Sequence, residues 1–206
     1  MRKFVKRLIC LLLVVVTVLG VVSFPIIKSG YSLYKETITN TPVEVKVEQI
    51  RSGDTYAAYE EISPVFIDLL VRSEDRRFYS HSGFDIISFS RAIVANFFSR
   101  SYSQGGSTLT QQLAKNMYFS FEKQLERKVA ELLVAFDLER MYTKEEILAL
   151  YCSMAYFGNR CYGVKQAARF YYNTDVSQLD DIQSYQLVET LKAPSVYNPS
   201  VMNDKR

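Results

Sequence analysis

Hydrophobic and polar positions divide the chain into an apolar N-terminal stretch and a longer body in which helical spacing dominates. Residues 8–27 contain no charged side chain, and twenty helical residues span about 30 Å, the thickness of a bilayer's hydrocarbon core. We predict a transmembrane helix over residues 8–27, preceded by a short tail at residues 1–7. A cleaved signal peptide is the alternative, but the apolar run is long for one and no A-x-A cleavage site follows it.

Residues 28–57 have the mixed composition of a stem between membrane and domain. Within this stem, Pro42 is followed by valines that alternate with charged residues through Val47, and the period of two predicts a short strand. Helix signals dominate from residue 58 to residue 206. We therefore expect one mostly α-helical domain over residues 58–206.

Local capping signals predict where the helices of this domain begin. Ser63 precedes a proline at a first helical position, and Asp85 can cap a helix that runs to about Ser99. Capping-box patterns predict that two more helices start at Thr108 and Thr143. Asp180 or Asp181 can start a last helix, which ends before a proline. The predicted loops are residues 76–84, 100–106 and 158–163.

The predicted helix over residues 121–141 has two faces of different character. One face is an apolar stripe that we expect to meet the core. This stripe contains Leu125, Val129, Leu132 and Phe136. The opposite face changes from charged to apolar through Lys123, Arg127, Glu131, Val134 and Leu138. Such a change is not typical of plain solvent surface, so we expect the second face to line a cleft.

Two apolar stripes lie side by side on the predicted helix over residues 85–99. The first contains Ile86, Phe89, Ile93 and Phe97, and the second contains Ile87, Val94 and Phe98. One stripe is enough to meet a protein core. We therefore predict that this helix dips into the outer face of a bilayer, the alternative being that both stripes are buried between helices.

Charge is distributed unevenly along the chain. The formal net charge is +3, and four of the 25 basic residues, Arg2, Lys3, Lys6 and Arg7, precede the apolar run. Without them, 25 − 4 = 21 basic residues face 22 acidic ones. The basic excess therefore predicts a cytoplasmic N-terminus with the body across the membrane, and it does not indicate a nucleic-acid-binding surface.

The cysteines and the single histidine exclude several classes of site. Cys152 and Cys161 could form a disulfide outside the cytoplasm or remain packed free thiols, and no His/Cys cluster has zinc-ligand spacing. Residues 120–123 match the S-x-x-K pattern of transpeptidases. No K-T-G or S-x-N motif follows this match, so a serine acyl-enzyme is rejected.

Polar blocks in the body could carry chemistry. Residues 74–85, which contain His81, place Glu74 where a helix is expected to end, so its carboxylate can face a cleft or belong to an ordinary solvated turn. Residues 104–116 place two glycines before a helix start. Free N–H groups there suit an anion, although an ordinary loop would show the same pattern. Residues 144–172 have the spacing of a helical scaffold.

Together these blocks resemble the peptidoglycan glycosyltransferase family, the transglycosylases of the penicillin-binding proteins. The motifs E-D-x-x-F-x-x-H-x-G-x-D at residues 74–85, G-G-S-T-L-T-Q-Q-L-x-K-N at 105–116 and R-K-x-x-E at 127–131 occur in family order. The likeness extends from residue 74 to about residue 199. With no transpeptidase domain in this sequence, the chain resembles a monofunctional member. The resemblance implies a lysozyme-like helical fold with a large head and a small jaw.

The resemblance also implies a substrate and a set of site residues. The substrate would be lipid II, a disaccharide-peptide on undecaprenyl pyrophosphate, which is polymerised into glycan strands. Glu74 would be the catalytic base, and Glu131 the second essential acidic residue. The pyrophosphate would be held by Lys115 and Lys123. The donor and acceptor clefts would be lined by Arg91, Ser107, Gln111, Gln112 and Arg127. A divalent cation, Mg²⁺ or Mn²⁺, at the pyrophosphate stays open, with Glu131 as its candidate ligand.

The resemblance implies that the protein lies in the cell membrane of a bacterium and crosses it once. Its partners would be membrane lipids and other cell-wall synthesis or division proteins, and it would bind no nucleic acid.

One departure from the family pattern is Ser153, which stands where members usually have Asn. Two alternative functions remain, a lytic muramidase with Glu74 as an acid and a non-catalytic membrane-bound scaffold.

Overall fold

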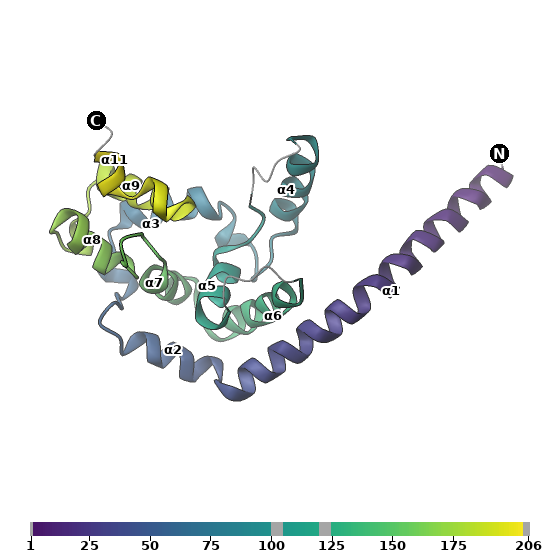
Figure 1. Cartoon of the computed structure of the whole chain (residues 1–206), viewed down its shortest axis with the longest axis horizontal. Coiled ribbons are helices and arrows are strands. Elements are labelled where there is room, and N and C mark those ends of the chain that lie inside the picture. Colours follow the sequence, from purple (N-terminus) through teal and green to yellow (C-terminus); the bar gives the residue numbers. More distant parts are fainter. Residues whose placement is uncertain (1, 100–104, 120–124, 204–206) are drawn as a thin grey trace.

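A computed structural model describes residues 2–99, 105–119 and 125–203 of the chain. The predicted mostly α-helical fold is confirmed, with a long N-terminal helix leading into a helical body (Figure 1). Within these residues there is no strand. The nearest approach to one is an isolated antiparallel bridge between Tyr156 and Tyr162.

Helix α1, Arg2–Asn40, is longer than the predicted transmembrane segment. Its 39 residues rise about 58 Å, roughly twice the thickness of a hydrocarbon core. In the described part of the chain, α1 is the one helix long and apolar enough to cross a membrane. Its first half projects away from the body, while its second half runs along α6 (Figure 1). The first part of the predicted stem is thus a continuation of the same helix.

The predicted strand after Pro42 is wrong, because these residues form helix α2, Val43–Arg51. The alternating valines also contain a helical spacing, since Val43 and Val47 are four residues apart. Both are buried in the core, whereas Val45 between them is exposed. Packing against the body therefore selects the helical period over the period of two.

Most of the predicted helix starts are confirmed. Asp85, Thr108, Thr143 and Asp180 each accept a backbone N–H at the start of a helix. Ser63 precedes α3 as predicted, but its hydroxyl donates to Leu179 O instead of capping the helix. The helices after the first two are α3 (Pro64–Glu74), α4 (Ile86–Ser99), α5 (Leu109–Tyr118), α6 (Leu125–Met141), α7 (Lys144–Met154), α8 (Val164–Tyr172), α9 (Asp181–Lys192), α10 (Pro194–Tyr197) and α11 (Pro199–Asn203). Single 3-10 turns lie at Tyr59–Glu61, Phe78–Ser80 and Val176–Gln178.

One continuous core joins α2, α3, α5, α6, α7, α8 and α9. Its largest fully buried side chains include Phe66, Phe78, Phe157 and Leu148. Residues 144–172 contribute much of this core, which confirms their predicted role as scaffold. Cys152 and Cys161 are both buried and free, so they are packed thiols and not a disulfide.

Ser153, the departure from the family pattern, is part of this scaffold. Its hydroxyl accepts a hydrogen bond from Ala57 N at 3.1 Å and donates one to Ala149 O at 2.7 Å. Nearby, Gly163 has a φ of 84°, and a Cβ on it would lie 2.6 Å from Ser153 O. The serine therefore ties the segment before α3 to α7 at a tightly packed point.

Helix α4 stands apart from the main body (Figure 1). Among the described side chains of α4, only that of Ala92 is buried. The described residues of both apolar stripes are exposed. Phe98, for example, has 79% of its surface exposed, and Ile86 has 66%. The alternative in which both stripes are buried between helices is therefore wrong for the described side chains; Phe97 lies outside them.

The predicted core stripe of α6 is also wrong. Leu125 is 66% exposed and Phe136 is 44% exposed. The buried residues of α6 are Ala130, Glu131, Val134, Ala135 and Leu138. The face that changes from charged to apolar is instead turned inward, with Val134 and Leu138 in the core, so the prediction that it lines a cleft is wrong for these two residues. Leu125, Val129 and Leu132 of the predicted core stripe line a cavity instead.

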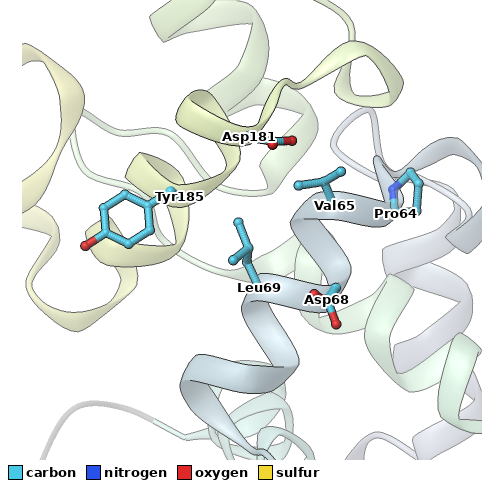
Figure 2. A pocket seen from close by; sticks show the side chains of 6 residues that line it. All are labelled: Pro64, Val65, Asp68, Leu69, Asp181 and Tyr185. Carbon is cyan, nitrogen blue, oxygen red and sulfur yellow. The ribbon is translucent and has the colours of Figure 1, made fainter.

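A shallow hollow of about 620 Å³ lies between α3 and α9, with the side chains of Val65 and Leu69 between the two helices (Figure 2). Pro64, Asp68, Asp181 and Tyr185 complete its lining. None of the predicted site residues belongs to it.

Candidate active site

Glu74 is the last residue of α3, and its side chain is half-buried. Gln112 Nε2 on α5 donates to Glu74 Oε2 at 3.1 Å. The oxygen of the same amide accepts a hydrogen bond from Tyr151 on α7 at 3.1 Å. Burial, and then the charge of Glu74, raise the pKa of Tyr151 well above its ordinary value, so its hydroxyl remains a donor. The chain of Tyr151, Gln112 and Glu74 fixes the orientation of the carboxylate.

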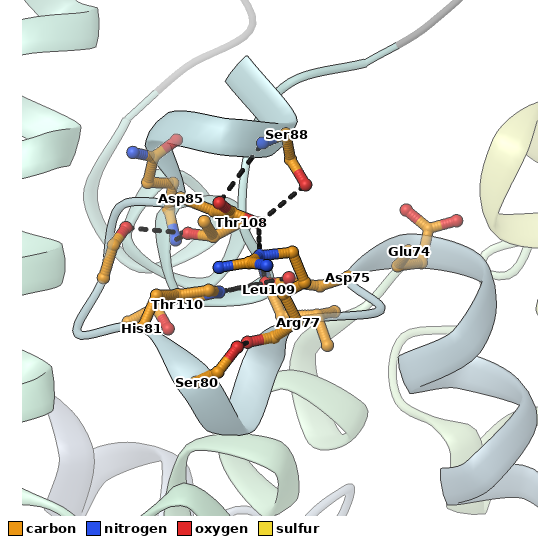
Figure 3. Close-up of polar contacts among 12 residues, drawn as sticks. Glu74, Asp75, Arg77, Ser80, His81, Asp85, Ser88, Thr108, Leu109 and Thr110 are labelled. Atoms are coloured by element: carbon orange, nitrogen blue, oxygen red, sulfur yellow. Dashed lines mark hydrogen bonds and ion pairs between the residues drawn. The ribbon is translucent and has the colours of Figure 1, made fainter. Parts of the chain in front are cut away.

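The neighbouring carboxylate of Asp75 points the other way and joins the first two sequence motifs. Its oxygens lie 3.0 and 3.1 Å from His81 Nε2, and Oδ2 also accepts Leu109 N at 3.0 Å (Figure 3). Asp75 therefore ties the loop after α3 to the first turn of α5. Figure 3 shows Glu74 directed away from this network, which leaves it available for other chemistry.

The loop between α3 and α4 is held at its far end by Asp85. Burial alone would raise the pKa of Asp85, but hydrogen bonds from Ser88 and Ile87 and the nearby Arg77 lower it overall. Arg77 Nε lies 3.0 Å from Asp85 Oδ2. Thr108 Oγ1 also donates to Gly83 O at 2.9 Å. The loop and the start of α5 are thus positioned as one unit.

Glu131 is 1% exposed and lies on the inward face of α6 between two cations. Arg127 Nε is 2.9 Å from Oε1, and Lys128 Nζ is 3.1 Å from Oε2. Lys128 also donates to Ser107 Oγ at 2.8 Å. A buried carboxylate needs such partners. Glu131 therefore organises cations that border the glycine-containing loop.

Lys115 on α5 belongs to the same electrostatic group. Burial lowers its pKa, Glu131 raises it in part, and Arg127 and Lys128 lower it further. Three cations thus act on one carboxylate, which leaves an excess of positive charge. A partly desolvated site with this excess suits a multiply charged anion such as a pyrophosphate.

A cavity of about 1160 Å³ opens beside this group. Ser107, Gln111 and Lys128 line one part of it with polar groups. Apolar side chains of α1, α4 and α6 line most of the rest. The cavity therefore combines a polar part next to the cations with a larger apolar lining.

The structure places most of the predicted site residues in separate groups, two of which include residues of α5. Glu74 and Gln112 are in contact, Arg127 pairs with Glu131, and Ser107 and Gln111 line the cavity. Arg91 is separate from them: it is exposed on α4, and its guanidinium lies 3.5 Å from Ser88 Oγ. Lys123 lies outside the described residues.

Two residues of the site were not predicted from the sequence. Lys128 bridges Glu131 and Ser107, and its position three residues before Glu131 on a helix was a usable signal. Tyr151 was assigned to the scaffold alone. Its hydrogen bond to Gln112 depends on how α7 packs against α5, so no local pattern reveals it.

The residues present do not fit a metal ion held by the protein. Both oxygens of Glu131 are occupied by cationic side chains. Over the described ranges, no group of three His, Cys, Asp or Glu side chains could hold a metal. We therefore derive no chemical step through a metal ion.

Comparison with known proteins agrees with the geometry. Residues 43–206 match the family described as Transglycosylase. Penicillin-binding protein 1A of Neisseria lactamica is 43% identical over 142 residues, 69% of this chain and 18% of that protein. Penicillin-binding protein 1A/1B of Bacillus subtilis is 36% identical over 214 residues, which cover 98% of this chain and 23% of that protein.

A third relative, penicillin-binding protein 1A of Vibrio cholerae, is 36% identical over 96% of this chain and 26% of its own length. The chain thus spans about a quarter or less of these curated relatives. The family match begins at residue 43, so the family domain includes α2, part of the segment predicted as stem. This chain belongs to the peptidoglycan transglycosylase family.

Proposed function

We propose that the chain polymerises lipid II into β-1,4-linked glycan strands and releases undecaprenyl pyrophosphate. The observation that carries this proposal is the cavity beside α6. Its polar end adjoins an excess of cations, and most of its remaining lining is apolar. A sugar joined through a pyrophosphate to a long hydrocarbon chain matches both parts.

Glu74 acts as the general base in this reaction. The attacking sugar hydroxyl must lose its proton as its oxygen bonds to the anomeric carbon of the donor. Glu74 accepts that proton, held in place by Gln112, whose amide donates to Oε2 and leaves Oε1 for the substrate. The protonated Glu74 then returns its proton to water.

The leaving group is stabilised by the cations around Glu131. As the bond from the anomeric carbon to the pyrophosphate oxygen breaks, the electron pair goes to that oxygen. Lys115, Arg127 and Lys128 balance the growing negative charge, a role supported by their grouping around Glu131. A pyrophosphate needs no general acid, in contrast to the sugar alkoxide that leaves in a glycoside hydrolase. Glu131, paired through both oxygens, serves to hold Arg127 and Lys128 in place.

The same proposal places the protein in the membrane. Helix α1 crosses the bilayer of a bacterial cell once, with the basic residues before Leu8 in the cytoplasm and the catalytic domain outside. The exposed apolar face of α4 lies in the outer leaflet. This arrangement keeps the pyrophosphate of a lipid-linked substrate at the level of the cation group.

The test is incubation of the purified full-length chain in detergent with labelled lipid II, followed by separation of products by size. We expect glycan polymer and free undecaprenyl pyrophosphate. Release of fragments from preformed glycan, without polymer from lipid II, would instead indicate a lytic enzyme. Binding of lipid II without either product would indicate a scaffold protein.

A further inference from the structure

One wall of the cavity comes from the membrane helix itself. Ser23, Ile26 and Ile27 of α1 line it, and their spacing of three and four residues places them on one helical face. Phe89 and Ile93 of α4 line the same cavity. Since α1 is continuous through residues 23–27, its transmembrane part and the catalytic domain enclose the same space.

The rotation of α1 about its own axis, which determines that this face lines the cavity, is fixed by contacts closer to the C-terminal end of the helix. Gly30 is buried against α6, where a Cβ would lie 2.5 Å from Val129 Cβ and 2.6 Å from Glu126 O. One turn further on, Tyr34 donates to Asp137 Oδ2 of α6 at 2.6 Å. Ser23, Ile27, Gly30 and Tyr34 follow one another at intervals of three and four residues. The close crossing at Gly30 therefore sets which residues of α1 face the cavity.

The shape and chemistry of the cavity define what this wall would contact. The volume of about 1160 Å³ exceeds the roughly 300–1,000 Å³ typical of sites for compact small molecules. Lys128 and Ser107 mark the end where an anion would sit. The α1 wall borders the apolar part, so it faces the hydrocarbon portion of a ligand whose charged portion is at Lys128.

We infer that Ser23, Ile26 and Ile27 of α1 form a substrate-binding element that holds the isoprenoid chain of the lipid-linked donor against α4 and α6. This inference rests on the proposed function and extends it, because α1 becomes part of the active site as well as an anchor.

The inference is tested with the full chain in phospholipid nanodiscs and two variants of α1. Ile27→Trp fills the cavity, whereas Phe24→Trp makes the same kind of change outside it. The two positions are similarly exposed, at 54% for Ile27 and 67% for Phe24. The substrates are lipid II and an analogue with the same head group on a short farnesyl chain.

For lipid II, Ile27→Trp is expected to raise KM about tenfold, the effect of losing roughly one side chain's worth of apolar contact, with kcat nearly unchanged. The farnesyl analogue should be affected much less, because its chain makes fewer contacts with the wall. Phe24→Trp should behave as wild type with both substrates.

Equal effects of Ile27→Trp and Phe24→Trp would overturn the inference, since they would mean that Ile27 meets only bulk phospholipid. An equal loss with long and short chains would overturn it as well. Failure of the wild type to polymerise either substrate would contradict the proposed function separately. Binding of fluorescent undecaprenyl pyrophosphate to the three proteins then decides the inference without turnover: weaker binding by Ile27→Trp alone supports it, and equal binding overturns it.

Discussion

The side-chain amide of Gln112 donates to Glu74 Oε2 at 3.1 Å, so one oxygen of the carboxylate is engaged and the other stays available. Glu74→Gln preserves the size of the side chain and an oxygen that can accept from Gln112. We expect the variant to fold normally and to lose about 10²–10⁴-fold in kcat, the usual contribution of a general base. The measurement is the initial rate of polymerisation at saturating lipid II.

Glu60→Gln is the matched control for this change, because Glu60 is exposed and lies outside the site. It should retain wild-type turnover. A folded Glu74→Gln variant with near-wild-type kcat would show that another group removes the proton.

Tyr151 is expected to affect turnover through Gln112. Tyr151→Phe removes the hydroxyl that holds the amide oxygen, and a buried acceptor left without its donor costs about 1–3 kcal/mol. The amide can then rotate, and Glu74 loses its fixed orientation. We expect kcat to fall about tenfold, equivalent to roughly 1.4 kcal/mol, with KM unchanged.

Tyr171→Phe separates this effect from general destabilisation. The Tyr171 hydroxyl donates to Phe157 O at 2.8 Å, within the scaffold. Both variants should lower the melting temperature, but only Tyr151→Phe should lower kcat. Equal effects of the two variants on kcat would mean that Tyr151 is structural alone.

Lys115 predicts an alkaline limit to activity. Burial lowers the pKa of its ammonium below the ordinary lysine value of about 10.4, although Glu131 opposes the shift. In the proposed function the charged form binds the pyrophosphate, so kcat/KM should be full below this pKa and should fall as pH rises through it. Lys115→Arg keeps its charge at all accessible pH values and should move the fall to higher pH.

The measurement is kcat/KM for lipid II across the alkaline range, which reports groups of the free enzyme. Lys46→Arg on α2, a lysine outside the cation group around Glu131, should leave the profile unchanged. If kcat/KM falls at the same alkaline pH in the wild type and in Lys115→Arg, Lys115 is not part of the anion site.

Two glycines of α1 offer a matched pair for testing how the anchor is joined to the domain. A Cβ on Gly30 would lie 2.5 Å from Val129 Cβ, while a Cβ on Gly20 would meet nothing within 4 Å. Gly30→Ala should therefore force α1 away from α6, at a cost of about 1–3 kcal/mol. Gly20→Ala should be neutral or slightly stabilising, since alanine favours helix by roughly 1 kcal/mol.

Both variants are compared by thermal unfolding in detergent and by polymerisation rate. Val129 lies between Lys128 and Glu131 in the sequence of α6, so a shift at the crossing reaches the cation group. Gly30→Ala should therefore lower both the melting temperature and the rate. A wild-type rate in Gly30→Ala would show that the packing of α1 on α6 is not coupled to the site.

Local signals in the sequence located many features of this fold. The caps at Asp85, Thr143 and Asp180 were predictable because an N-cap depends on a few adjacent residues. The motif residues Glu74 and Glu131 were found by resemblance to a family, and their physical setting agrees with the roles it implies. The assignment of those roles stays a prediction.

Features that depend on packing between helices were not predictable. Val43 and Val47 fit both a strand and a helix, and burial against the body decides between them. On α6, two faces carry enough apolar residues for a core, and the face with small residues such as Ala130 and Ala135 is the one turned inward. The wall formed by Ile27 depends on the rotation of α1, which the crossing at Gly30 sets.

The exposed face of α4 predicts membrane binding that does not depend on the anchor. Ile87, Val94 and Phe98 are each more than half exposed, and together with Ile86 and Ile93 they form a broad apolar surface. Such surfaces mark membrane or partner contacts in soluble domains. A lipid-linked substrate favours the membrane, because its pyrophosphate stays at the bilayer surface. Arg91, exposed on the same helix, can reach lipid phosphates while its stem lies along apolar groups.

The test uses a chain that begins at Lys28, which keeps the part of α1 that packs on α6, and measures its flotation with anionic phospholipid vesicles. This chain should bind the vesicles. Phe98→Glu should weaken the binding at least about tenfold, since a large side chain contributes roughly 1.5–3 kcal/mol when buried.

Ile182→Glu is the control, because Ile182 is 70% exposed on α9 in the helical body. Its binding should match that of the unsubstituted chain, whereas equal losses in the two variants would show that charge alone, and not the face of α4, governs binding. If the chain that begins at Lys28 does not bind vesicles, the prediction for α4 is wrong and the first half of α1 is the sole membrane contact.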